Sequence, residues 1–222
     1  MGILNTAITA SGGLATISSI QAVVTTGVQT SGTRVDNFKW EEAGREYRYD
    51  YSRQEDGHKQ SLASGHGSPV AQVNGGTVFP LTKFSYVQHI PFDIPIVYLV
   101  ACLAGPAAVI SQPTASQTDT ANPARVVIRF QNVSGKLSPE ELWTFDPQTN
   151  LPVSVRYYAP GLTPFSPGEV LRAKFLNYQT ESGIMLPQLI ELHGPSEGFV
   201  ISYQVDTITL NPTINVSDFN LQ

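Results

Sequence analysis

Two histidines and two acidic residues lie close together in one polar stretch, and these side chains are of the types that bind divalent metals. His58 and His66 are eight positions apart, and Glu55 and Asp56 come just before them. Tight metal sites use three or four ligands at defined spacing, and this stretch contains no cysteine. We therefore expect solvated surface residues here, and no metal or other cofactor.

The other candidates for chemistry do not form a catalytic set. Cys102 is the only cysteine, so no intramolecular disulfide is possible, and its apolar surroundings indicate a buried small side chain. Ser68 does not stand at the centre of a G-x-S-x-G motif, so residues 65–69 are not a nucleophile elbow. Glu140 and Glu141 are neighbours and point apart in any regular element. The sequence therefore predicts that the protein is not an enzyme.

Composition favours short strands with many turns. The 222 residues include 16 prolines and 18 glycines, and only 14% are charged. The net charge is -5 and no basic stripe is visible in the sequence, so we expect no nucleic-acid partner. Residues 94–110 are the most apolar run, but Gly105-Pro106 interrupts it. This favours a buried helix over a membrane span, and a soluble protein.

The first half of the chain predicts one helix followed by strands. Leu14, Ile17 and Ile20 step along one helical face, which predicts a helix from about Thr6 that ends before Gly27. Residues 36–40 and 45–52 read as strands, and alternation places Tyr47, Tyr49 and Tyr51 on one face of the second strand. The polar residues 54–76 are expected to form strand ends and loops.

The remaining sequence predicts a helical insert and then an antiparallel meander. Prolines divide residues 81–104 into two or three short helices, the second over residues 96–103, and a loop follows over residues 111–123. Turn residues then separate six short β patterns. These cover residues 126–130, 142–145, 153–158, 171–179, 187–193 and 199–206. The expected fold class is α+β.

Turn motifs in the second half resemble those of a known fold. Residues 146–152 read D-P-x-T-x-L-P, residues 178–187 read Y-x-x-x-x-G-x-x-x-P, and the chain closes on Asn211 and Asp218-Phe219. This pattern resembles the LolA/LolB-like lipoprotein-carrier superfamily, and within it the carrier-like cell-envelope proteins. The resemblance covers residues 142–219 well and residues 10–51 loosely. It does not cover the insert at about residues 80–122.

The resemblance implies one domain over residues 1–222, with a strongly bent antiparallel sheet, a half-barrel, and short helices packed in its concave mouth. Sheet and helices of such a fold enclose an apolar cavity that takes acyl chains. Residues that would line it here lie on the expected lid helices and strands. They are Phe84, Phe92, Ile94, Val97, Tyr98, Trp143, Phe145, Tyr157, Phe175, Phe199, Ile201 and Tyr203.

The implied function is an exported, soluble binding protein that holds a lipid or a lipoprotein acyl chain, in the periplasm or cell envelope. A lipoprotein or an envelope protein is a further expected partner. Met1 to Leu4 do not begin a signal peptide, so the chain is expected to be a mature form. Carriers of this type hold the lid with an arginine, and Arg34 is the nearest in chain order, in different surroundings. The alternative is a structural or interaction module with a filled core.

Overall fold

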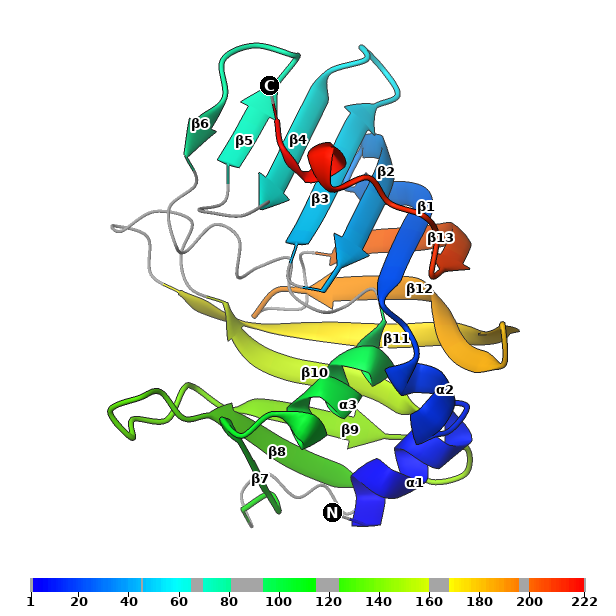
Figure 1. Ribbon diagram of the computed structural model, residues 1–222, viewed down its shortest axis with the longest axis vertical. Coiled ribbons are helices and arrows are strands. Elements are labelled where there is room, and N and C mark those ends of the chain that lie inside the picture. Colours follow the sequence, from blue (N-terminus) through cyan, green and yellow to red (C-terminus); the bar gives the residue numbers. More distant parts are fainter. Residues whose placement is uncertain are drawn as a thin grey trace. The chain divides into compact units, whose positions relative to one another are not determined.

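Antiparallel strands make up most of the regular secondary structure in the described residues, and short helices accompany them (Figure 1). The computed structural model describes all residues except 1, 45, 65–69, 81–93, 115–123, 160–167, 196–199 and 222. The chain divides into two compact units. The first comprises Met1–Ser19, Pro91–Ala159 and Glu169–Phe199, and the second comprises Ile20–Ile90, Pro160–Gly168 and Val200–Gln222.

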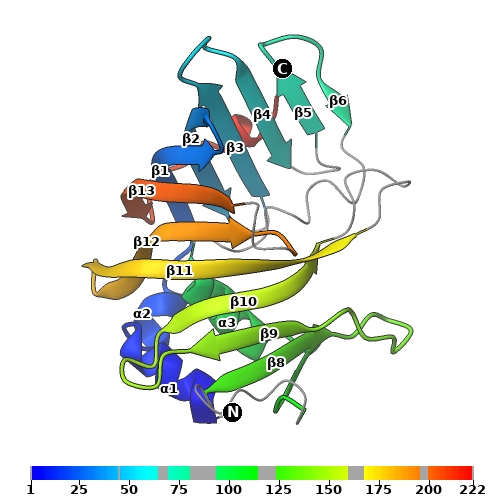
Figure 2. The same ribbon diagram turned by 180° about the vertical axis from the view of Figure 1, so that it is seen from behind.

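The first unit is a sheet with helices packed on one of its faces (Figures 1 and 2). Its strands lie in the order β12-β11-β10-β9-β8-β7, and neighbouring strands are antiparallel. The elements are α1 (Gly2–Ala10), α2 (Leu14–Ser18), α3 (Pro95–Ala104), β7 (Ala108–Ser111), β8 (Arg125–Phe130), β9 (Glu141–Phe145), β10 (Pro152–Ala159), β11 (Glu169–Glu181) and β12 (Ile184–His193).

The second unit is a sheet in the order β6-β5-β4-β3-β2-β1-β13, again antiparallel wherever strand partners are assigned. Trp40, Tyr49 and Tyr51 bury their rings on one face, which confirms the alternation predicted for the tyrosines. The elements are β1 (Ala22–Ser31), β2 (Arg34–Ala43), β3 (Glu46–Arg53), β4 (Lys59–Ser64), β5 (Val70–Val73), β6 (Phe79–Pro80), β13 (Val200–Leu210) and the 3-10 helix η3 (Val216–Phe219).

The predicted N-terminal helix is wrong in its extent. Gly12 and Gly13 adopt φ values of 124° and 87°, so the segment breaks into α1 and α2 instead of forming one helix. The helical segment does end before Gly27, as predicted, and β1 begins at Ala22. There the side-chain oxygen of Asn211 accepts the backbone N–H of Gln21 at 2.6 Å. The β-branched residues that follow then favour a strand.

Other boundaries also differ from the prediction. Residues 54–76 contain two complete strands, β4 and β5, because pairing with β3 supplies backbone partners to a polar sequence. Within the insert, α3 confirms the helix predicted over residues 96–103, and β7 is a strand that was not predicted. Pro187 does not begin a strand, because β12 starts at Ile184. The other lid helix, expected near Phe84, lies outside the described residues.

The two turn motifs hold each other in place. The Oδ1 atom of Asp146 accepts the backbone N–H groups of Gln148 and Thr149 at 2.9 and 2.7 Å, which closes the β9–β10 turn. The N–H of Thr149, followed by that of Gln148, holds the pKa of Asp146 below its usual range. Tyr178, in the second motif, donates its hydroxyl to the carbonyl of Pro152 at 2.7 Å. The motif residues therefore fix the register of β9 to β11.

The break between α1 and α2 seats these helices on the β11–β12 hairpin. The backbone N–H of Met185 donates to the carbonyl of Ser11 at 3.1 Å, and Gly12 lies against the backbone of Gly183. Among the described residues, no helix is long and apolar enough to cross a membrane.

Gly12→Ala is expected to lower the free energy of unfolding by at least about 2 kcal/mol, because its Cβ would collide with the Gly183 carbonyl at a positive φ. Gly13→Ala is the matched control. It has a positive φ but nothing within 4 Å of its Cβ, so only backbone strain of about 1 kcal/mol applies. Urea denaturation measures the free energy of unfolding of both variants. Equal losses of stability would contradict a close contact between Gly12 and the Gly183 carbonyl.

Candidate functional site

The helix α3 is the element that places side chains over the sheet of the first unit. It begins with Pro95 in its first turn, where a missing N–H is tolerated. Its sequence is almost wholly apolar, and Ile96, Leu99 and Cys102 are buried. Burying a Leu or Ile side chain contributes about 1.5–3 kcal/mol, so this face keeps α3 against the sheet.

Three aromatic rings form a continuous stack beneath α3. The ring of Tyr98 lies 5.7 Å from that of Trp143 on β9, and Trp143 lies 5.9 Å from Phe175 on β11, all measured between centroids. Trp143 and Phe175 are at most 1% exposed. In the described part of the first unit, side chains therefore fill the space beneath Tyr98.

A carboxylate lies at the edge of this stack and accepts two hydrogen bonds. Tyr98 donates its hydroxyl to Oε1 of Glu141 at 2.6 Å, and the indole N–H of Trp143 donates to Oε2 at 3.0 Å. Burial raises the pKa of Glu141, and the two hydrogen bonds oppose that shift. Burial and the neighbouring Glu141 raise the pKa of Tyr98 well above its usual range. The helix and the sheet are thus joined by a short polar contact as well as by apolar packing.

The cysteine beside this contact is a buried thiol. Burial, followed by the nearby charge of Glu141, raises the pKa of Cys102 to about 12, so the thiol stays protonated at neutral pH. Cys102 is buried, as the sequence predicted. The two adjacent glutamates point apart, also as predicted, because Glu140 forms an ion pair with Arg129 at 2.6 Å. The cluster is therefore suited to holding α3 on the sheet.

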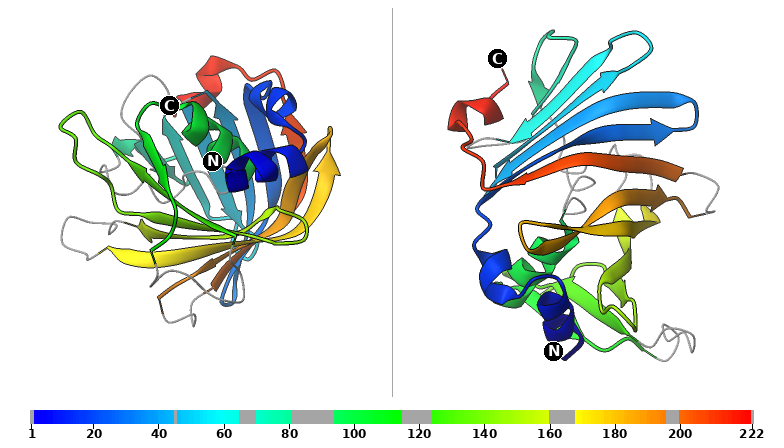
Figure 3. Two further views of the ribbon diagram at one scale, coloured as in Figure 1. Left: turned by 90° about the horizontal axis from the view of Figure 1, so that it is seen from below. Right: turned by 90° about the vertical axis from the view of Figure 1, so that its right-hand side faces the viewer.

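Among the described residues of the first unit, the helices α1, α2 and α3 lie side by side (Figure 3). An apolar groove lies between them. Its volume is about 670 Å³. We call it the helical groove. Its lining is largely apolar, and Leu14 on α2 is 57% exposed there. The lining residues are Asn5, Ile8, Thr9, Leu14, Ser18, Val100, Leu103 and Ala104.

Sequence reasoning missed both the helical groove and the contact between Tyr98 and Glu141. The groove needs α1, whose residues were read as part of a longer helix. The contact joins residues 43 positions apart, and no local spacing indicates it. The one available signal was Glu141 itself, an ionisable residue next to the apolar sequence of β9.

The residues predicted to line a cavity separate into three groups. Ile94, Val97, Tyr98, Trp143, Phe145, Tyr157 and Phe175 belong to the first unit, and most of these are buried. Ile201 and Tyr203 belong to the second unit, where Tyr203 packs on Phe38 and Trp40 at 5.8 and 5.0 Å. Phe84, Phe92 and Phe199 lie outside the described residues. The cavity-lining role of all twelve residues remains a prediction.

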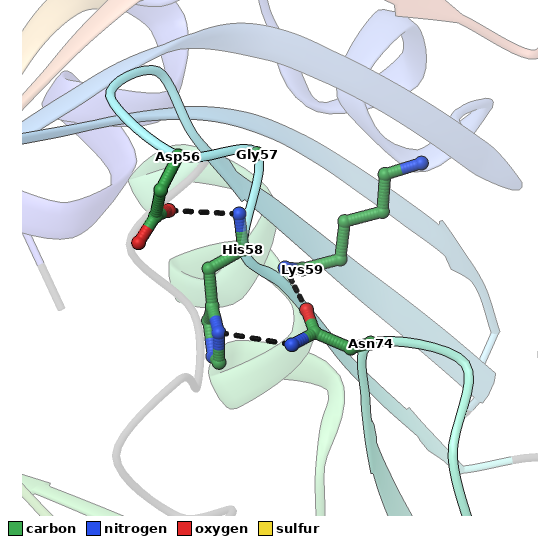
Figure 4. A pocket seen from close by; sticks show the side chains of 5 residues that line it. All are labelled: Asp56, Gly57, His58, Lys59 and Asn74. Carbon is green, nitrogen blue, oxygen red and sulfur yellow. Dashed lines mark hydrogen bonds between the residues drawn. The ribbon is translucent and has the colours of Figure 1, made fainter.

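A polar surface pocket surrounds His58, the first candidate metal ligand (Figure 4). Asn74 donates from Nδ2 to Nδ1 of His58 at 3.1 Å. Asp56 accepts the backbone N–H of His58, which is the main cause of its lowered pKa, and forms an ion pair with Arg53. Within the described residues no three potential metal ligands gather, and His66 lies outside them.

Arg34, the arginine nearest in chain order to a lid-holding position, forms an ion pair within the second unit. It lies at the start of β2, in the second unit, and its Nε atom is 2.6 Å from Oδ2 of the buried Asp36. The guanidinium of Arg34 thus pairs with a carboxylate two residues away on the same strand.

Tyr98→Phe is expected to lower the free energy of unfolding by about 1–3 kcal/mol, because it removes a donor from a buried carboxylate. Tyr158→Phe is the matched control, since this tyrosine is 43% exposed. Chemical denaturation at neutral pH compares the two. If Tyr158→Phe lost as much stability as Tyr98→Phe, the hydrogen bond from Tyr98 to Glu141 would not be the stabilising contact.

Glu141 also predicts a pH dependence of stability. Folding raises its pKa above the ordinary value of 4.5, so the folded state holds the proton more tightly than the unfolded state. This contribution to stability is complete below pH 4.5 and is lost as the pH rises through the folded pKa. The difference in the free energy of unfolding between the wild type and Glu141→Gln should therefore change across this pH range. Thermal denaturation of both proteins as a function of pH measures this difference in stability.

The fold matches solved structures, although neither protein-family models nor curated protein sequences match the chain. A DUF1329 family protein from Desulfovibrio piger superposes with a TM-score of 0.59 at 12% identity, over 100% of this chain and 98% of that one. A LolA superfamily protein from Nitrosomonas europaea gives a TM-score of 0.56 at 10% identity, over 99% and 96%. A domain from Vibrio parahaemolyticus, described as belonging to an outer membrane lipoprotein-sorting protein, gives 0.57 at 11%, over 99% and 95%. The resemblance inferred from the turn motifs is confirmed as a likeness of fold: the chain has a LolA-like α+β fold.

Proposed function

We propose that the protein binds an apolar chain, such as the acyl chain of a lipid, in the helical groove. The observation that carries this proposal is the groove itself, which has about 670 Å³ and a largely apolar lining. Ligand sites in proteins typically have volumes of about 300–1,000 Å³ and a few polar groups among apolar ones. Each methylene that leaves water for such a lining contributes about 0.8 kcal/mol to binding.

The polar residues of the groove suit an amphiphilic ligand. Asn5, Thr9 and Ser18 stand among the apolar lining residues. The hydroxyl of Thr9 donates to the backbone carbonyl of Asn5 at 2.9 Å, so its oxygen retains accepting capacity. An acyl chain along Leu14 and Leu103 would leave its head group near these polar side chains.

The second candidate is the alternative of a structural or interaction module with a filled core. The stack of Tyr98, Trp143 and Phe175 favours it, because it leaves no room for a ligand beneath this part of α3. A ligand held between the sheet and α3 would have to displace Tyr98 from Trp143. The helical groove requires no such displacement, and we therefore place the ligand there.

We also propose that the protein works in the cell envelope, with lipid or a lipoprotein as its partner. The support is the LolA-like fold, shared with the Vibrio parahaemolyticus domain that is described as one of lipoprotein sorting. The role is binding or carrying, and catalysis is not part of the proposal.

Leu14→Asp is expected to weaken binding of a fluorescent fatty acid at least about tenfold, because a carboxylate in the groove loses its hydration when the chain enters. Leu14 is largely exposed, so the variant should remain folded. Thr16→Asp, on the same helix but outside the groove lining, is the matched control. Fluorescence titration measures the affinities of the wild type and both variants.

The opposite result is equally clear. If the wild type takes up no fatty acid in the titration, and native mass spectrometry after incubation with lipid extract shows only the unliganded mass, the filled-core alternative is correct. If Leu14→Asp binds as tightly as Thr16→Asp, the ligand does not occupy the helical groove.

A further inference from the structure

The three helices that form the helical groove come from stretches of the chain without any charged side chain. Residues 2–33 and 94–114 contain no Asp, Glu, Lys, Arg or His, although 14% of the whole chain is charged. Surface helices of soluble proteins normally carry charged residues on their solvent side. Here the exposed positions of α1 and α2 hold small polar residues instead, such as Asn5, Thr9 and Ser18. The groove therefore opens in an uncharged part of the first unit.

The groove lining offers no counter-charge to an anionic head group. Among the described residues that line it, none is ionisable. A carboxylate that approaches the lining loses part of its hydration, and neutral side chains do not compensate this loss as a cation would. A fatty acid enters such a groove by its chain alone, and its carboxylate gains no ion pair there.

The end of α3 adds a negative potential to the same part of the groove. Leu103 and Ala104 line the groove from the last turn of this helix of 10 residues. Backbone carbonyls in the last turn of a helix lack partners within it and act together as about half a negative charge. The last turn of α3 contains no basic residue that would balance this charge. An anion is therefore disfavoured at this end of the groove.

Hydrogen-bond acceptors, in contrast, are available around the groove. The hydroxyl of Thr9 donates to the carbonyl of Asn5 at 2.9 Å, so the oxygen of Thr9 can still accept. Asn5 and Ser18 are exposed and contribute an amide oxygen and a hydroxyl oxygen to the lining. A carboxylate only accepts hydrogen bonds, whereas a hydroxyl group also donates them. A head group with hydroxyls matches these oxygens, and a carboxylate does not.

We propose that the preferred ligand of the helical groove is an acyl chain with an uncharged, hydroxyl-bearing head group, of the acylglycerol class, and not a free fatty acid. The glycerol hydroxyls donate to the oxygens of the groove and to the last carbonyls of α3, while the acyl chain lies along Leu14 and Leu103. The proposed function is the basis of this inference, which names the ligand class of the same groove.

Glycerol monolaurate and laurate carry the same acyl chain and differ only in the head group. Isothermal titration calorimetry at neutral pH, below the concentration at which either probe forms micelles, compares their affinities. Glycerol monolaurate should bind at least about fivefold more tightly, because one net hydrogen bond changes an equilibrium constant about two- to tenfold. Equal affinities, or tighter binding of laurate, would overturn the inference and leave the apolar groove as a binding site. If neither probe binds, the proposed function itself fails.

Ala104→Lys tests whether the head group lies at the end of α3. Ala104 is exposed, and a lysine in the last turn of a helix is compatible with folding. Its ammonium group supplies the missing counter-charge, so the affinity for laurate relative to glycerol monolaurate should rise about two- to fivefold. Ala101→Lys, at an exposed position of α3 outside the groove lining, is the matched control and should leave this ratio unchanged. An unchanged ratio in Ala104→Lys, or an equal shift in both variants, would overturn the inference.

Discussion

The hydrogen bond from Tyr98 to Glu141 is the contact on which the arrangement of the first unit depends. At 2.6 Å it joins α3 to β9 across the same interface in which Tyr98 stacks on Trp143. Apolar packing is not directional and would allow α3 to slide on the sheet. A carboxylate with two fixed donors does not allow this, because any shift leaves a partly buried charge without partners. The position of α3, and hence one wall of the helical groove, follows from this contact.

The antiparallel register then gives the sheet two chemically different faces. Side chains alternate along each strand, so the residues between the buried aromatics must emerge on the other side. On β10 and β11 these are arginine, lysine and exposed apolar residues. The same register that buries Tyr157 and Phe175 therefore gathers cations that are distant in the sequence.

The sequence allowed the strands of the second half to be predicted because turns and alternation are local signals. Asp146 closes its turn with its own neighbours, and Pro152 and Tyr178 mark positions that the fold uses directly. The break at Gly12 was not predicted, because the apolar spacing that indicated the helix, Leu14, Ile17 and Ile20, lies wholly on its C-terminal side. Positive φ values and a backbone contact with Gly183 decide that break, and these come from tertiary structure.

The same reasoning explains why the candidate site was only partly predictable. Aromatic residues such as Trp143 and Phe175 were expected near a ligand, but a linear pattern does not distinguish a cavity wall from a filled core. Nor was the pairing of Arg156 with Arg172 visible, because these residues are 16 positions apart and meet only through the β10–β11 register. A local spacing rule sees one strand at a time, whereas the composition of a sheet face depends on which strands become neighbours.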